Sequence, residues 1–174
     1  MNTKKLIEAQ KILDERIFLK HIPENLEEFE YRKVQRIVAN LVELAEFINE
    51  TRVFKFWSNK APEREKMLEE YVDGIHFFLG NAIERGWEDS IHSITEGIKE
   101  NTKKIESIEQ TYLEINYYLS AIEVRKATHP KYFENAWLLY LALGMNAFGF
   151  TGEEIEAAYY AKNQINHDRQ ASGY

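Results

Sequence analysis

Residues 43–58 read E-L-A-E-F-I-N-E-T-R-V-F-K-F-W-S, and residues 68–79 read L-E-E-Y-V-D-G-I-H-F-F-L. In both segments, acidic residues interrupt an otherwise apolar pattern that has helical spacing. The polar residues between the two segments include Pro62, and proline suits the first turn of a new helix. We therefore expect two helices joined by a short connection and packed antiparallel, with the rest of the chain arranged around them.

The acidic residues of these two segments fall on defined helix faces. At about 100° per residue, Glu43, Glu46 and Glu50 share one face of the first helix. Glu70 and Asp73 are three residues apart and share a face of the second helix. Antiparallel packing would direct Glu43, Glu46, Glu70 and Asp73 at one point.

Four carboxylates at one point repel each other strongly. At ~6 Å and an effective dielectric of ~20, each pair repels by roughly 3 kcal/mol, so the total is comparable to the stability of a whole domain. The acids must therefore splay into water, hold protons or bind a metal ion. The apolar character of residues 34–48 leaves them little free surface, which favours a metal site over a solvated acidic edge. Oxygen ligands without cysteine suit hard cations, Mg²⁺ or Mn²⁺.

Composition limits the class of protein. The chain has 174 residues, 44% of them hydrophobic and 13% aromatic, which excludes disorder and fits a single domain over residues 1–174. The net charge of −7 argues against binding to a nucleic acid polymer. No apolar run of about 18 residues suggests a membrane span, and the amphipathic N-terminus does not resemble a signal peptide. With no cysteine in the chain, we expect a cytoplasmic location.

Helical periodicity covers nearly the whole chain and predicts an all-α bundle of about six helices. Residues 132–148 are apolar almost all round and should be buried or form an interface. The second helix should turn Ile37, Val38, Leu41, Ala45 and Ile48 toward the core. The expected helices cover residues 3–20, 26–51, 62–84 (ending near Gly86), a weak helix or connection at 88–100, a helix capped by Asn101 or Thr102 that carries Ile105 to Ile122, residues 132–148, and a last helix capped by Thr151.

Three residues near the acids have two readings each. His76 follows Asp73 in a D-x-x-H pattern, but the second Glu-x-x-His element of a di-iron bundle is missing from the sequence. We therefore read His76 as a substrate-side or a structural histidine. Trp57 is either a core residue or a stacking surface for a base. Lys55 is a surface residue, or it pairs with the acids or with a phosphate.

The C-terminal residues also have two readings. Residues after Asn166 lack an apolar stripe, so composition favours a solvated end that is mobile without ligand. The longer tail after Tyr159 concentrates donors suited to phosphate or to a base edge, which are Lys162, Asn163, Asn166, Arg169 and Gln170.

Four blocks together resemble the dimeric all-α dUTPases, which belong with the MazG-like nucleoside triphosphate pyrophosphohydrolases. The blocks are E-L-A-E-F-I-N-E, F-K-F-W-S, E-E-Y-V-D-G-I-H-F and K-N-Q-I-N-H-D-R-Q-A-S-G-Y. The first and third fit the E-x-x-E…E-x-x-D pattern of the superfamily. The second and fourth are specific to the dUTPase branch.

The resemblance implies a reaction and a metal site. The reaction is hydrolysis of dUTP to dUMP and pyrophosphate, with dUDP as a further substrate, in a homodimer. Glu43, Glu46, Glu70 and Asp73 would hold two or more Mg²⁺ ions, for which Mn²⁺ would substitute. Glu43 or Glu46 would accept a proton from the attacking water that the metal activates, and Glu50 is an additional candidate ligand.

The resemblance also implies roles in substrate binding. Trp57 would lie against the uracil and Asn166 would read its edge. The other candidates are Gln10 and His76 for the same pocket, Lys162, Arg169 and Lys55 for the phosphates, and Tyr174 at the end of the fourth block. Two alternatives stay open. The same acids fit a related pyrophosphohydrolase acting on another nucleotide such as dCTP, and the chain could be a non-catalytic helical dimer.

Overall fold

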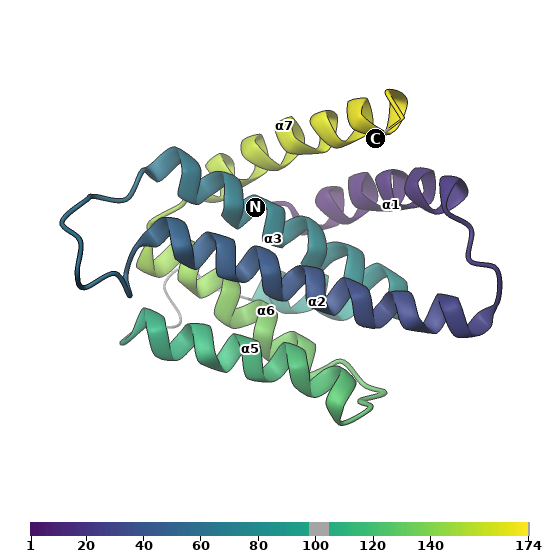
Figure 1. The fold of residues 1–174 in the computed structure, drawn as a ribbon, viewed down its shortest axis with the longest axis horizontal. Coiled ribbons are helices and arrows are strands. Elements are labelled where there is room, and N and C mark those ends of the chain that lie inside the picture. Colours follow the sequence, from purple (N-terminus) through teal and green to yellow (C-terminus); the bar gives the residue numbers. More distant parts are fainter. Residues whose placement is uncertain (98–104, 174) are drawn as a thin grey trace.

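A computed structural model describes residues 1–97 and 105–173 of the chain (Figure 1). These residues form seven α-helices and one π-helical turn, and they contain no strand. The all-α prediction is confirmed, with seven helices where about six were expected. The elements are α1 (Thr3–Lys20), α2 (Leu26–Thr51), α3 (Arg64–Arg85), α4 (Glu88–Gly97), α5 (Ile108–Val124), α6 (Lys131–Ala142), η1 (Leu143–Ala147) and α7 (Gly152–Ala171).

Side-chain caps account for several helix starts. Asn25 accepts a hydrogen bond from the backbone N–H of Glu28 at the start of α2. Thr151 caps α7, as the sequence predicts, and forms a reciprocal capping box with Glu154. At the end of α3, Gly86 adopts a left-handed backbone with φ of 69°, which ends the helix where expected.

Two predicted helix starts are wrong. Helix α3 begins at Arg64, two residues later than predicted, so Pro62 lies in the connection and not in the first turn. Helix α5 begins at Ile108 because the Ser107 side chain accepts from the backbone N–H of Gln110. Ile105 therefore precedes the helix, and the proposed caps at positions 101 and 102 lie outside the described residues.

The antiparallel pair α2 and α3 is the centre of the fold. Helices α1 and α7 pack on α3 and on each other, and α5 and α6 pack together on the other side of the pair (Figure 1). Leu44 and Phe47 of α2 and Tyr71, Ile75 and Leu79 of α3 are fully buried. The acidic segments thus lie in the middle of the molecule, as the sequence predicts.

The core-facing residues of α2 differ in part from the prediction. Ile37 and Ile48 are buried, but Val38 and Ala45 are exposed. The buried stripe continues through Leu44 instead, so the helix is rotated relative to the predicted face. The exposed apolar residues of α2 are therefore left on the surface of the single chain.

A pair of tyrosines joins α3 to α6. The rings of Tyr71 and Tyr140 stack at 4.7 Å, and the Tyr140 hydroxyl donates to the Tyr71 carbonyl at 2.8 Å. The Tyr71 hydroxyl donates to the Tyr140 carbonyl at 3.3 Å. Gly144 makes room for this pair, since a Cβ atom there would lie 2.2 Å from the Tyr71 ring. Tyr71 follows Glu70 directly, so the tyrosine pair fixes the part of α3 that carries the acids.

Most of the apolar segment 132–148 is buried within the single chain, although Asn146 and Ala147 near its end are exposed. Phe133, Trp137 and Tyr140 of α6 and Leu143 of η1 have no exposed surface. Of the two expectations for this segment, burial and an interface, the structure supports burial. The segment is therefore no longer a candidate interface. In the described part of the chain, no helix is both long and apolar enough to cross a membrane.

Candidate active site

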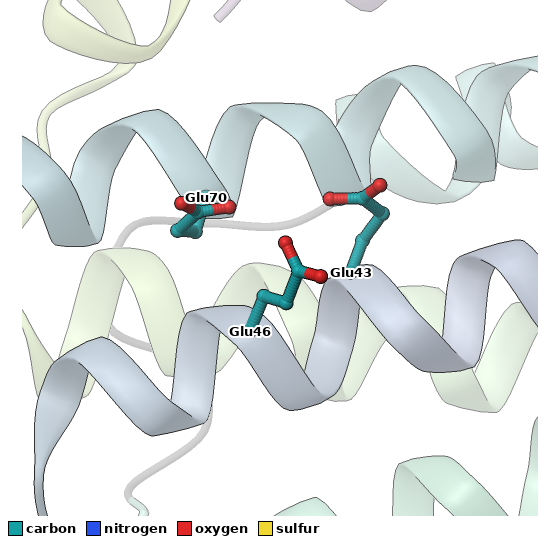
Figure 2. Close-up of side chains that lie close together, drawn as sticks. All are labelled: Glu43, Glu46 and Glu70. Carbon is teal, nitrogen blue, oxygen red and sulfur yellow. The ribbon is translucent and has the colours of Figure 1, made fainter.

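Three of the four expected metal ligands converge between α2 and α3. Figure 2 shows Glu43 and Glu46 extending from α2 toward the helix that carries Glu70. One carboxylate oxygen from each residue lies within 4.8 Å of the others. We call Glu43, Glu46, Glu70 and the adjoining Asp73 the acid cluster.

Asp73 is held by a lysine of α7. The ammonium nitrogen of Lys162 lies 2.6 Å from Asp73 Oδ2 and 3.3 Å from Glu69 Oε1. Asp73 is one turn beyond Glu70 on α3 and interacts electrostatically with Glu43. Glu50 is outside the converging group, and its carboxylate accepts a hydrogen bond from the Asn49 side chain at 3.2 Å.

The acid cluster carries more negative charge than the neighbouring Lys162 offsets. Burial, followed by the nearby charges of Asp73, Glu46 and Glu70, raises the pKa of Glu43 to about 7. Burial and neighbouring acids also raise the pKa of Glu70. Burial raises the pKa of Asp73, although Lys162 opposes the shift. A bound cation would favour the ionised form of each group, and the all-oxygen donor set suits Mg²⁺.

A pocket of about 420 Å³ opens beside the acid cluster. Residues from α1, α2, α3 and α7 form its walls, and Glu43 and Asp73 belong both to the walls and to the acid cluster. The structure thus brings together eight residues that the sequence singled out. They are Gln10, Glu43, Asp73, His76, Lys162, Asn166, Arg169 and Gln170.

Gln10 and His76 form a buried hydrogen-bonded pair at the pocket wall. Gln10 Oε1 lies 2.8 Å from His76 Nδ1 and accepts from the Tyr159 hydroxyl at 2.7 Å. The imidazole stacks on the Tyr159 ring at 4.0 Å. Burial lowers the pKa of His76 to about 3, so the ring is neutral at physiological pH.

An ion pair behind Gln10 fixes its orientation. Gln10 Nε2 donates to Asp14 Oδ1 at 3.0 Å, and Arg36 Nη1 lies 3.1 Å from Asp14 Oδ2. Because a carboxylate only accepts, Asp14 holds the amide group of Gln10 in one orientation. Gly80 leaves space for the pair, since a Cβ atom there would lie 2.7 Å from Arg36 Nη1.

Sequence reasoning missed Asp14, Arg36 and Tyr159. The four-residue spacing of Gln10 and Asp14 is a signal that the sequence contains. Arg36 and Tyr159 are far from Gln10 along the chain, so only the packing of α2 and α7 on α1 and α3 reveals them.

Two predicted substrate residues lie outside the pocket. Trp57 is 65% exposed in the loop between α2 and α3, where it contacts the rings of Phe54 and Phe56. Lys55 Nζ donates to the Asn49 carbonyl at 3.1 Å. Tyr174 lies outside the described residues.

The end of the chain is helical where a mobile segment was expected. Helix α7 continues to Ala171, and α1 supplies partners for its last turns. Arg16 Nη1 lies 3.4 Å from His167 Nδ1, and Lys20 Nζ donates to the Gln170 carbonyl. These contacts keep Arg169 and Gln170 at the pocket wall.

Comparison with known proteins identifies the family of the chain. A family model described as dUTPase matches residues 2–174, which is the whole chain except Met1. No curated protein matches the chain.

Proposed function

Because the chain belongs to the all-α dUTPase family, we propose that it hydrolyses dUTP to dUMP and pyrophosphate in the pocket beside the acid cluster. Membership makes the chain a hydrolase of the dUTP diphosphatase type. The observation that carries the proposal is that the acid cluster and the pocket share residues. Glu43 and Asp73 belong to the acid cluster and also line the pocket that contains Asn166 and Arg169. One site therefore offers carboxylates for cations beside donors for a nucleotide.

The acid cluster fits divalent cations. Glu43, Glu46 and Glu70 would hold them, and Asp73 would join once Lys162 releases it. Bound Mg²⁺, in two or more copies and replaceable by Mn²⁺, would neutralise phosphate charge and lower the pKa of the attacking water. Either Glu43 or Glu46 accepts the proton of that water, and the position of Glu43 in the pocket wall supports the first choice.

The pocket wall offers two kinds of donor. Asn166 lines the same pocket as the buried pair of Gln10 and His76, and in this proposal it reads the base. A primary amide offers a donor and an acceptor that complement a uracil carbonyl and N3–H, whereas cytosine presents the opposite pattern. Lys162 and Arg169 provide the positive charge for the phosphates.

The exposed aromatic loop completes the base site in this proposal. Trp57 lies outside the pocket wall, so it would reach a bound uracil only after the loop closes over the pocket. Its exposure supports this role, since a core tryptophan would be buried. Lys55, in the same loop, would approach the phosphates in the same movement.

The molecule acts as a single domain and as a homodimer in this proposal. Helices α2 and α5 pack side by side, and both expose apolar residues. On α2, the spacing of residues 31, 38, 42 and 45 is that of a helix–helix seam. The exposed apolar residues of the two helices are Leu26, Tyr31, Val38, Val42, Ala45, Leu113, Tyr117 and Val124. This surface replaces residues 132–148 as the proposed interface.

A nucleotide panel tests the proposed substrate. Purified protein is incubated with dUTP, dUDP, dCTP, dTTP or UTP, with and without Mg²⁺, and the released pyrophosphate or phosphate is measured. We expect Mg²⁺-dependent turnover of dUTP, with slower or no turnover of dCTP. Preferential hydrolysis of dCTP would place the chain among related pyrophosphohydrolases with another substrate and would refute the assignment of the base.

A further inference from the structure

Lys162 forms an ion pair with one member of the acid cluster, Asp73. Its ammonium group bridges Asp73 and Glu69 at 2.6 and 3.3 Å. The Lys162 and Asp73 side chains are only 15% and 17% exposed, so water screens their attraction less than in a surface pair. The lysine comes from α7, whereas the acids come from α2 and α3. The contact therefore joins two parts of the fold across the site.

The charges of the acid cluster are not balanced by this lysine. Four carboxylates carry four negative charges when ionised, and one ammonium offsets one of them. The attraction of Lys162 lowers the pKa of Glu43 but is outweighed by burial and by the neighbouring acids. Two divalent cations would supply four positive charges. The ammonium would then be surplus, and it would repel the cations that approach Asp73.

The pocket offers the displaced ammonium another partner. Lys162, Asn166 and Arg169 are spaced by four and three residues on α7 and line the same pocket. A lysine carries its charge on a flexible four-carbon stem, so the ammonium can move by several Å while α7 stays in place. The phosphates of a nucleotide bound in the pocket would form an ion pair with the Lys162 ammonium.

We propose that Lys162 is an internal counter-ion of the acid cluster, which divalent cations displace from Asp73 toward the phosphates of the nucleotide. The inference rests on the proposed function and adds a coupling between its two ligands. In the protein without nucleotide, Lys162 weakens cation binding. When phosphates hold the ammonium, the nucleotide strengthens cation binding, and by reciprocity the cation strengthens nucleotide binding.

The test measures cation binding directly. Lys162→Met removes the ammonium and keeps an apolar stem of similar length. Calorimetric titration with Mn²⁺, in the absence of nucleotide, should show that the variant binds the ion about fivefold or more tightly than the wild type, the lower end of typical coupling between sites. The non-hydrolysable analogue α,β-imido-dUTP should then increase the Mn²⁺ affinity of the variant by a smaller factor than that of the wild type. Without metal, the variant should melt at a lower temperature than the wild type.

A matched control separates this effect from overall charge. Lys11 Nζ pairs with Glu88 at 2.8 Å between α1 and α4, outside the pocket. Lys11→Met makes the same change in charge and should leave Mn²⁺ affinity unchanged. Equal or weaker Mn²⁺ binding by Lys162→Met, or equally tightened binding by Lys11→Met, would overturn the counter-ion role.

The proposal and the proposed function fail in different ways. A wild-type protein that binds no Mn²⁺ would overturn both. A wild-type protein that leaves dUTP intact, while Lys162→Met still binds Mn²⁺ more tightly, would refute the function and support the counter-ion. A wild-type protein that hydrolyses dUTP and binds Mn²⁺ with the affinity of the Lys162 variant would overturn the counter-ion alone.

Discussion

The carboxyl group of Glu43 is the most informative single group of the site at the residue scale. It is half-buried, lies among acids and lines the pocket, and its pKa rises to about 7. A carboxyl with a pKa near neutrality responds to small changes in charge around it, which is how functional acids are commonly tuned. Its titration in metal-free protein therefore reports on the charges of the acid cluster.

The raised pKa of Glu43 predicts how stability depends on pH without metal. The folded pKa of about 7 lies above the unfolded value of 4.5, so the folded state binds the proton more tightly. The stabilisation is complete below pH 4.5 and is lost as pH rises through about 7. We expect the melting temperature of the wild type to fall relative to that of Glu43→Gln over this range. Melting curves from pH 5 to pH 8 in chelator check this, and parallel curves would contradict it.

Trp57 provides a second prediction at the residue scale. If its indole stacks on uracil, Trp57→Ala should weaken dUTP binding by roughly 1–3 kcal/mol and hardly change metal binding. Because Trp57 is exposed, the melting temperature should stay the same. The matched control is Phe56→Ala, in the same loop and 94% exposed, which should weaken binding less. An unchanged KM together with a clear loss of stability would show that Trp57 only packs against the protein.

At the scale of the elements, close packing of α3 against α6 and η1 holds the acids in place. The stacked tyrosines require glycine at the point of closest approach, because a Cβ atom on Gly144 would collide with the Tyr71 ring. Tyr71 is buried on all sides, so its ring has no free space to enter.

Gly144→Ala should therefore destabilise the protein. Overpacking of a close-packed core typically costs about 1–3 kcal/mol, which lowers the melting temperature by several degrees in a chain of this size. Gly97→Ala is the control, since a Cβ atom there meets nothing within 4 Å. Thermal unfolding of both variants checks the prediction. Equal melting temperatures for the two variants would contradict the packing argument.

The elements were largely predictable from sequence, whereas their contacts were not. The bounds of α1 and α2 follow from apolar periodicity, and the cap of α7 follows from Thr151 and Glu154. The rotation of α2, which leaves Val38 exposed, depends on which faces of the other helices cover it. The start of α5 depends on the local choice of Ser107 as cap.

The candidate site was also predictable only in part, because some of its residues follow from local spacing and others from the packing of distant helices. Spacing along two helices is enough to predict that Glu43, Glu46 and Glu70 converge. The partners that organise the site come from distant positions, and no local pattern marks them. Lys162 approaches Asp73 only because α7 packs on α3, and Arg36 approaches Asp14 only because α1 and α2 both pack on α3.

At the scale of the whole molecule, the exposed apolar surface of α2 and α5 predicts a homodimer. Val42→Glu places a charge within this surface and should produce a monomer of 20.6 kDa that keeps its helical content. Ile12→Glu makes the same change at an exposed position of α1 and should leave the dimer intact. Sedimentation at micromolar concentration distinguishes the two forms. A wild type that is already monomeric would contradict the interface.

The central claim is that the acid cluster and the adjoining pocket form a metal-dependent dUTP hydrolase. It is tested most directly by measuring pyrophosphate release from dUTP, with and without Mg²⁺, for the wild type, Glu70→Gln and Glu65→Gln. Glu65 lies on α3 but is exposed and outside the acid cluster. We predict Mg²⁺-dependent turnover by the wild type and by Glu65→Gln, and less than about a tenth of that rate for a folded Glu70→Gln, since losing a ligand removes several kcal/mol of transition-state stabilisation. Wild-type turnover by Glu70→Gln would contradict the assignment of the site.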